Sequence, residues 1–107
     1  MVIQKYLTKT NYTKGVLKKN EYIVLHYTAN NGDTAWGNCN YFYKEYRGSS
    51  AHYFVDEHSI WQCVEDGNIS WGVGLSTKDL LSGKAKYYNG ARNSNCINIE
   101  MCSRKDQ

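Results

Sequence analysis

The stretch YIVLHYTAN, residues 22–30, predicts the strand that organises the fold. Its first four residues are apolar or aromatic, and such a continuous run favours a central position in a sheet. We therefore predict a strand over residues 21–27. The run ends in His26, which is followed by small polar residues and the turn sequence NNGD at residues 30–33. An imidazole at this place is either a structural residue bonded to the backbone or the ligand of a metal ion, since neutral imidazole is a common protein ligand of zinc.

The composition is that of one small globular domain. A chain of 107 residues has room for one modest core, so we predict a single domain over residues 1–107 with a basic, irregular arm over residues 1–20. The net charge of +3 is mild, and the lysines of the arm are more typical of a solvated surface than of a nucleic-acid-binding one. No stretch could cross a bilayer, and the first residues lack the apolar segment of a signal peptide. We therefore expect a protein made in the cytoplasm that reaches an outer target only after release.

Three further features are predicted after the first strand. The sequence TAWGNCNYFYKEYR predicts a helix over residues 34–47, capped by Asp33 and ended by Gly48. Residues 51–66 predict a β-hairpin whose strands are AHYFVD and IWQCVE. Residues 67–95 are rich in glycine and predict a long loop, functional rather than idle, with a brief helical turn at DLLSGK.

The sequence CINIEMC, residues 96–102, predicts a last strand because its apolar residues alternate. Ile97, Ile99 and Met101 share one face, and Asn98, Glu100 and Cys102 share the other. The elements together predict an α/β fold with a single mixed sheet flanked by helices. The cysteines show no Cys-x-x-Cys spacing, which argues against a cysteine-cluster zinc site and favours reduced thiols in the core.

Several side chains besides His26 are candidates for chemistry. Glu100 is either an outward charge on its strand or a carboxylate held in a cleft, where it would suit general base work. His52 begins a strand and could lie near His26 if the two strands are neighbours, whereas His58 stands in an acidic turn typical of an exposed histidine. Trp71, in the glycine-rich SWGVG, is either a core residue or a stacking surface for a sugar or peptide.

Five short motifs occur in an order that resembles a known family. They are LHYTA, SAHYFVD, IWQ, SWGVG and NSNCINIE, and together they span about residues 20–103. In this order they resemble the zinc-dependent N-acetylmuramoyl-L-alanine amidases of the second amidase family. That family includes phage endolysins and bacterial autolysins, and it is related to the animal peptidoglycan recognition proteins.

The resemblance implies a role for each matching residue. His26 matches the family's first zinc ligand, and Glu100 matches the glutamate of the family's Ile-Gly-Ile-Glu strand, taken as the base that activates a zinc-bound water. His52 matches a histidine near the cleft that is not itself a ligand, Trp71 matches the tryptophan of a Trp-His-Ala-Gly loop beside the substrate groove, and Asn93 matches an asparagine before the glutamate strand. The implied substrate is bacterial peptidoglycan, and the implied bond joins N-acetylmuramic acid to the first L-alanine of the stem peptide.

Two departures from the family pattern shape the expectation. The loop reads Trp71-Gly72-Val73-Gly74, so its histidine is replaced by Gly72. The family's other two zinc ligands lie downstream of the glutamate strand, beyond a helix, and the sequence stops at Gln107 before that region. We therefore expect an amidase-like fold whose C-terminal part is missing, with weak or no Zn²⁺ binding and little hydrolysis by this chain alone.

Two other functions are compatible with the sequence. A catalytically inactive amidase domain could still bind peptidoglycan. A nucleic-acid-binding module is suggested by the tyrosines among lysines in KAKYY and KEYR, but no nucleic-acid-binding motif is present. If the sheet has an uncovered apolar face, we expect self-association or a complementing C-terminal segment.

Overall fold

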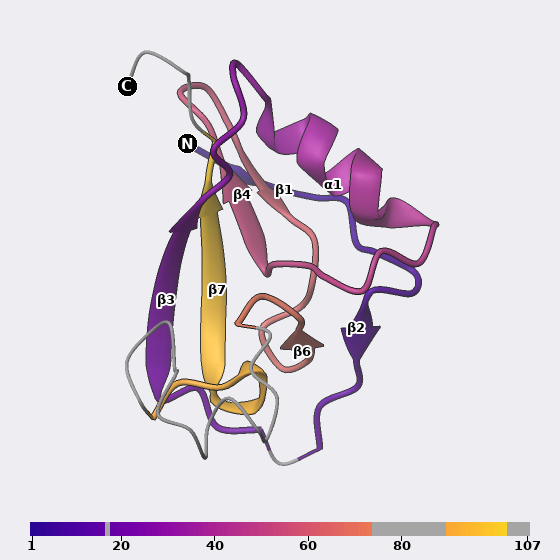
Figure 1. The fold of residues 1–107 in the computed structure, drawn as a ribbon, viewed down its shortest axis with the longest axis vertical. Helices are drawn as coiled ribbons and strands as arrows, with labels where there is room; N and C mark the ends of the chain where they lie inside the picture. Colours follow the sequence, from indigo (N-terminus) through magenta and orange to yellow (C-terminus); the bar gives the residue numbers. More distant parts are fainter. Residues whose placement is uncertain (17, 74–89, 103–107) are drawn as a thin grey trace.

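A five-stranded mixed sheet forms the centre of the protein, with one α-helix packed on it (Figure 1). The structure is a computed structural model and describes residues 1–16, 18–73 and 90–102. The strand order is β1-β5-β4-β7-β3, and two short strands, β2 and β6, pair separately. The bounds are β1 Ile3–Lys5, β2 Tyr12–Thr13, β3 Tyr22–Tyr27, α1 Ala35–Tyr43, β4 Tyr53–Val55, β5 Ile60–Gln62, β6 Ile69–Ser70, the 3-10 turn η1 Asn93–Asn95 and β7 Cys96–Met101. The predicted α/β fold with a central mixed sheet is confirmed. The prediction of a single sheet flanked by helices is wrong for the described residues, because β2 and β6 form a second, two-stranded sheet and α1 is the one α-helix.

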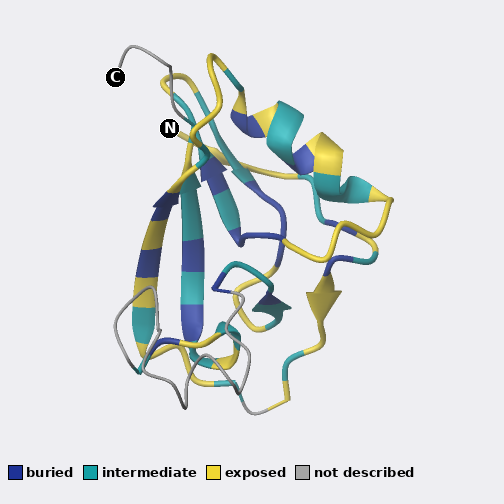
Figure 2. Cartoon of the chain, viewed as in Figure 1, coloured by how far each residue is buried: buried dark blue, intermediate teal, exposed yellow. Residues whose placement is uncertain are grey.

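Strands β3 and β7 run parallel, in register from Tyr22 opposite Cys96 to Tyr27 opposite Met101. Both strands were predicted, but the central position predicted for β3 is wrong, because β3 is the outermost strand of the sheet. The apolar run indicated burial on both faces, whereas Figure 2 shows buried and exposed residues alternating along β3.

One face of the sheet at its β3 edge carries exposed apolar side chains. Ile23, Leu25 and Tyr27 of β3 are 69%, 58% and 68% exposed, and Met101 of β7 is 44% exposed. Their neighbours Val24 and His26 point to the opposite face, on which α1 packs, and are buried. The described part of the chain therefore combines one covered sheet face with one largely uncovered apolar face.

Helix α1 is shorter than predicted at both ends. Thr34, not Asp33, is its N-cap, and the Thr34 hydroxyl accepts a hydrogen bond from the Gly37 N–H at 3.0 Å. The helix ends at Tyr43 rather than at Gly48, and the N-terminal segment donates hydrogen bonds to its last carbonyl groups. The Lys9 N–H donates to the Tyr43 carbonyl at 2.8 Å.

The first twenty residues, expected to be an irregular arm, take part in the fold. Strand β1 lies at the far edge of the sheet, parallel to β5, and β2 pairs antiparallel with β6. Asn11 is completely buried, and its Nδ2 donates to the carbonyls of Phe42 and Glu45, both at 2.7 Å. The segment thus holds the C-terminal end of α1, which the local sequence alone does not indicate.

The predicted hairpin is confirmed as β4 and β5, which pair antiparallel. Asp56 shapes its turn, since one carboxylate oxygen accepts from the N–H groups of His58 and Ser59, and the other accepts from the Ala35 N–H at 2.8 Å. The turn is thereby fixed to the start of α1. The predicted helical turn at DLLSGK lies outside the described residues.

Apolar packing between α1 and the sheet forms the main core. Phe54 of β4 is 2% exposed and stacks on Phe42 of α1 with ring centroids 5.7 Å apart. Cys39 and Cys63 are fully buried beside them as free thiols, as predicted for the cysteines. In the part of the chain described, no helix is long and apolar enough to cross a membrane.

Candidate functional site

His26 and Glu100 lie directly opposite each other at the C-terminal ends of two neighbouring parallel strands. The register that pairs β3 with β7 puts both side chains on the face that α1 covers. His26 is 8% exposed, whereas Glu100 is half-buried. The strand pairing therefore brings together the two residues that the sequence singled out most strongly.

Glu100 borders an open cavity of about 740 Å³ beside α1. The lining includes Thr28 and Asn30 after β3, Asn38 of α1 and Ser50 before β4. Ligands of α/β proteins commonly bind in a crevice at the C-terminal ends of parallel strands, which is where this cavity lies. A carboxylate at the wall of such a crevice can take up or deliver a proton to a bound molecule.

His26 is held from behind by a chain of buried polar groups. Its Nε2 lies 2.9 Å from Oδ1 of Asn98, and Asn98 Nδ2 donates to Oγ of Ser70 at 2.7 Å. Ser70 Oγ lies 3.0 Å from Nδ1 of His52. Asn98, Ser70 and His52 are all completely buried. The structure thus links the two predicted histidines, but through two residues rather than by direct contact.

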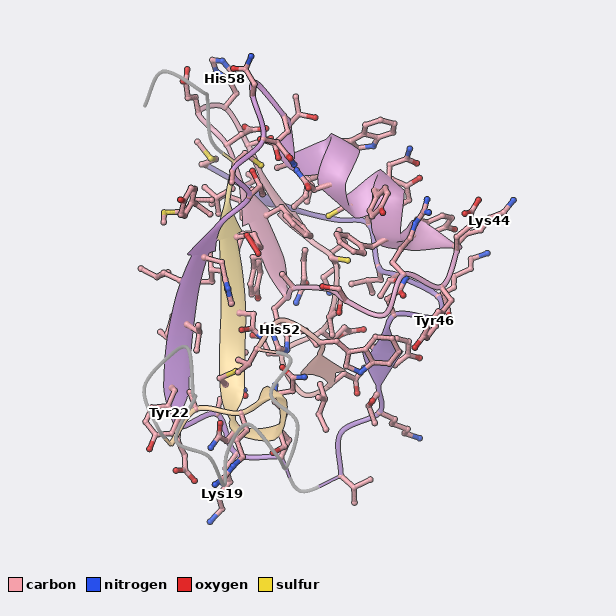
Figure 3. All side chains as sticks on the ribbon, viewed as in Figure 1. Lys19, Tyr22, Lys44, Tyr46, His52 and His58 are labelled. Carbon is pink, nitrogen blue, oxygen red and sulfur yellow. The ribbon has the colours of Figure 1, made fainter. Side chains whose placement is uncertain are left out.

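His52 has no exposed surface and lies in the interior, far from the exposed turn that carries His58 (Figure 3). Its Nε2 lies 2.8 Å from the carbonyl of Asn68. Burial lowers the pKa of His52 to about 4, the bond to Asn68 opposes this, and the Lys18 ammonium lowers the pKa further. The ring is therefore neutral near pH 7, and its position does not offer it to a bound molecule.

We expect the protein to lose stability in mild acid because of His52. The unfolded chain binds a proton at this ring near pH 6.5, but the folded chain does so only near pH 4. The stability that neutral His52 contributes is therefore fully present above about pH 6.5. It falls by about 2–3 kcal/mol as the pH drops from there towards 4. Urea unfolding of wild type and His52→Gln from about pH 7 to about pH 4.5 tests this, with the exposed His58→Gln as control. An equal pH dependence in wild type and His52→Gln would contradict the assignment.

Trp71 and Asn93, predicted to contact substrate, are bonded within the fold. The Trp71 indole N–H donates to Oγ1 of Thr13 at 2.9 Å, and its ring meets the Tyr46 ring edge-on. Asn93 accepts a hydrogen bond at 2.8 Å from the Val73 N–H. Neither borders the cavity at Glu100. Their roles in substrate contact stay predictions.

The described residues do not complete a metal centre. Within residues 1–16, 18–73 and 90–102, no three His, Cys, Asp or Glu side chains are grouped so that they could hold a metal ion. A catalytic zinc ion in proteins has three protein ligands and one open position. His26, the one predicted ligand, stands opposite Glu100 in the strand pairing but does not itself line the cavity.

Sequence reasoning missed Asn98 and Ser70. The signal for Asn98 was present, because it shares a strand face with Glu100 two residues away. That face was taken to be the polar, outward one, whereas Cys96 and Asn98 on it are completely buried. Ser70 gave no signal, since it stands in the stretch interpreted as a glycine-rich loop.

The comparisons with known proteins define the class of protein. The family model of the N-acetylmuramoyl-L-alanine amidases matches residues 17–107, and the chain belongs to this family. It is 39% identical over 72 residues to Protein Ami of Listeria monocytogenes, which covers 67% of this chain and 8% of that protein. It is 31% identical over 88 residues to a probable N-acetylmuramoyl-L-alanine amidase of Bacillus licheniformis, with 78% of this chain and 24% of that protein covered.

Solved structures agree with this assignment. The structure of PlyL superposes with a TM-score of 0.76 and 25% identity, and the match covers 100% of this chain and 61% of PlyL. The chain thus spans less than a third of each of the two curated relatives and less than two thirds of PlyL.

Proposed function

We propose that this chain acts as a peptidoglycan amidase domain that hydrolyses the amide between N-acetylmuramic acid and the L-alanine of the stem peptide. The observation that carries the proposal is the placement of Glu100. It borders an open cavity at the end of β7 and lies opposite His26 in the neighbouring strand. Membership of the amidase family supports the choice of substrate.

Glu100 has the position and the chemistry of a general base. Its carboxylate would take a proton from the attacking water and pass it to the amine that leaves with the stem peptide, so that the amide C–N bond breaks and no net proton is consumed. His26 would present its imidazole at the same end of the sheet. Members of this family are generally zinc-dependent, and a zinc ion supplies a polarised carbonyl and an activated water. Among the described residues, His26 is the one evident ligand for such an ion.

The hydrolysis is tested by incubating the chain with purified peptidoglycan. The readout is soluble stem peptide with a free N-terminal alanine, measured with added zinc and with a chelator. Release that depends on zinc supports the proposal. If no stem peptide is released by a chain that circular dichroism shows to be folded, hydrolysis by this chain is excluded.

A second candidate function is peptidoglycan binding without hydrolysis. The observation that favours it is the lack of a three-ligand group among the residues described. Sedimentation with insoluble peptidoglycan in the presence of a chelator separates the two functions. Co-sedimentation without release of stem peptide would establish a binding domain, whereas a chain that stays in the supernatant would contradict this alternative.

We also propose that copies of this chain associate through the apolar sheet face of Ile23, Leu25 and Tyr27. An exposed apolar patch of this kind commonly marks an interface. A Leu25→Lys substitution would place a charge in its middle and is expected to shift the chain to monomers in sedimentation velocity. Val16→Lys is the matched control, because Val16 is 79% exposed in another segment. A wild-type chain that is monomeric at high concentration would contradict self-association and leave a complementing segment as the partner of this face.

A further inference from the structure

The contacts of the buried polar groups behind His26 favour one arrangement of their protons. The starting point is a pair of backbone groups at His52 that have no choice of role. The N–H of Asn98 lies 3.1 Å from Nδ1 of His52 and can only donate. The carbonyl of Asn68 lies 2.8 Å from Nε2 and can only accept. The Lys18 Nζ lies 3.1 Å from the same Nε2, but it donates at 2.8 Å to the carbonyl of Asn68. Both backbone contacts thus favour a neutral His52 with its proton on Nε2 and a lone pair at Nδ1.

The roles of the next groups follow in turn. The Ser70 Oγ lies 3.0 Å from Nδ1 and donates to it, so that this nitrogen accepts from both the Ser70 hydroxyl and the Asn98 N–H. Its oxygen can then accept from Asn98, and the atom of Asn98 that lies 2.7 Å away is the amide Nδ2. This orientation turns Oδ1 of Asn98 towards His26, where it lies 2.9 Å from Nε2. Because Oδ1 can only accept, neutral His26 carries its proton on Nε2.

We propose that Asn98, Ser70 and His52 are positioning residues that fix His26 in the Nε2–H tautomer and so make Nδ1 its basic nitrogen. The functional meaning of this arrangement rests on the function proposed above. Nδ1 is then the atom that would bind a metal ion, accept a proton or receive a hydrogen bond from a substrate. Asn98 acts on His26 directly, and the other two residues act by fixing the orientation of the Asn98 amide.

The backbone at Gly72 leaves the space in which the Asn98 amide lies. A Cβ at Gly72 would stand 2.6 Å from Cγ of Asn98 and 2.9 Å from both Oδ1 and Nδ2. These distances are too short for any side chain at position 72 while the amide keeps its hydrogen bonds. Gly72→Ala therefore disturbs the chain of groups without removing any of its polar atoms.

Nuclear magnetic resonance of the ¹⁵N-labelled, metal-free chain near neutral pH tests the proposal. The two-bond correlations of an imidazole ring show which nitrogen carries the proton. For wild type we expect a protonated Nε2 and an unprotonated Nδ1 at His26, with an Nε2–H signal protected from exchange with water. A proton on Nδ1 of His26 would overturn the proposal, and because neither substrate nor zinc is present this outcome is independent of the proposed hydrolysis.

Variants separate positioning from general structural support. Asn98→Leu keeps the size of the side chain but removes the acceptor, so the protected signal of His26 should be lost. Asn98→Asp restores an acceptor and should restore the signal, and Gly72→Ala should weaken it with all polar groups present. His58→Gln, in the exposed turn, is the matched control and should leave it unchanged. An unaltered His26 signal in both Asn98→Leu and Gly72→Ala would overturn the proposal.

Discussion

Replacing Glu100 by glutamine is expected to lower the rate of stem-peptide release from peptidoglycan, with zinc added, by about 10²- to 10⁴-fold. The amide of glutamine has nearly the shape of the carboxylate but cannot take up the proton of the attacking water. Glu100 lies at the wall of the cavity, so a bound molecule can reach its carboxylate. The rates of the variant and wild type are compared on the same peptidoglycan preparation, and binding is followed separately by sedimentation.

The control for this experiment is Glu65→Gln, which removes the same charge from an exposed position after β5. We expect this variant to release stem peptide at the wild-type rate. If Glu100→Gln kept full activity, Glu100 would not be the base. If it lost binding to peptidoglycan together with activity, its role would be in holding the substrate rather than in proton transfer.

Replacing Phe54 by alanine is expected to lower the free energy of unfolding by about 3–5 kcal/mol. The side chain is 2% exposed and is stacked on Phe42, so alanine would leave a cavity between β4 and α1. Domains of this size are commonly stable by about 5–15 kcal/mol, so the loss would remove much of the total. Urea unfolding followed by tryptophan fluorescence gives the difference.

Tyr27→Ala, compared in the Leu25→Lys background so that association does not contribute, is the matched control for this loss. It also truncates an aromatic side chain on a strand, but at a position that is 68% exposed. We expect its unfolding free energy to stay within about 0.5 kcal/mol of that of the Leu25→Lys chain. A loss for Phe54→Ala as small as that of the control would mean that α1 is not held on the sheet by this contact.

The strands were predictable where local sequence decides them. The apolar run at β3, the hairpin of β4 and β5, and the alternation of β7 each carry their own period and turn residues. The position of β3 at the edge of the sheet was not predictable, because strand order depends on pairing between segments distant in the sequence. The end of α1 was missed as well, and the N-terminal segment that bonds to it is likewise distant in the sequence.

The candidate site was predictable only in part. His26 was found because it ends an apolar run, and Glu100 because a carboxylate stands within an alternating strand. Both residues also match the family motifs, and their juxtaposition follows from the parallel register. The groups behind His26 were not found, because the polar face of β7 was expected to point outward. Asn98 on that face is in fact completely buried. A single alternating pattern with polar residues on one side does not say which side is covered.

The fit between Gly72 and Asn98 restricts the order in which the two positions can change over evolutionary time. A larger residue at position 72 is blocked while Asn98 is present, since its Cβ would stand 2.6 Å from the amide carbon. A smaller residue at position 98 is not blocked in this way and would open the space for a later enlargement at position 72. The amidase pattern has the reverse arrangement. The large residue is a histidine at the loop position that corresponds to Gly72, and the small residue is a glycine at the strand position that corresponds to Asn98. A stepwise route that avoids overlap between the two side chains passes through a chain with small residues at both positions.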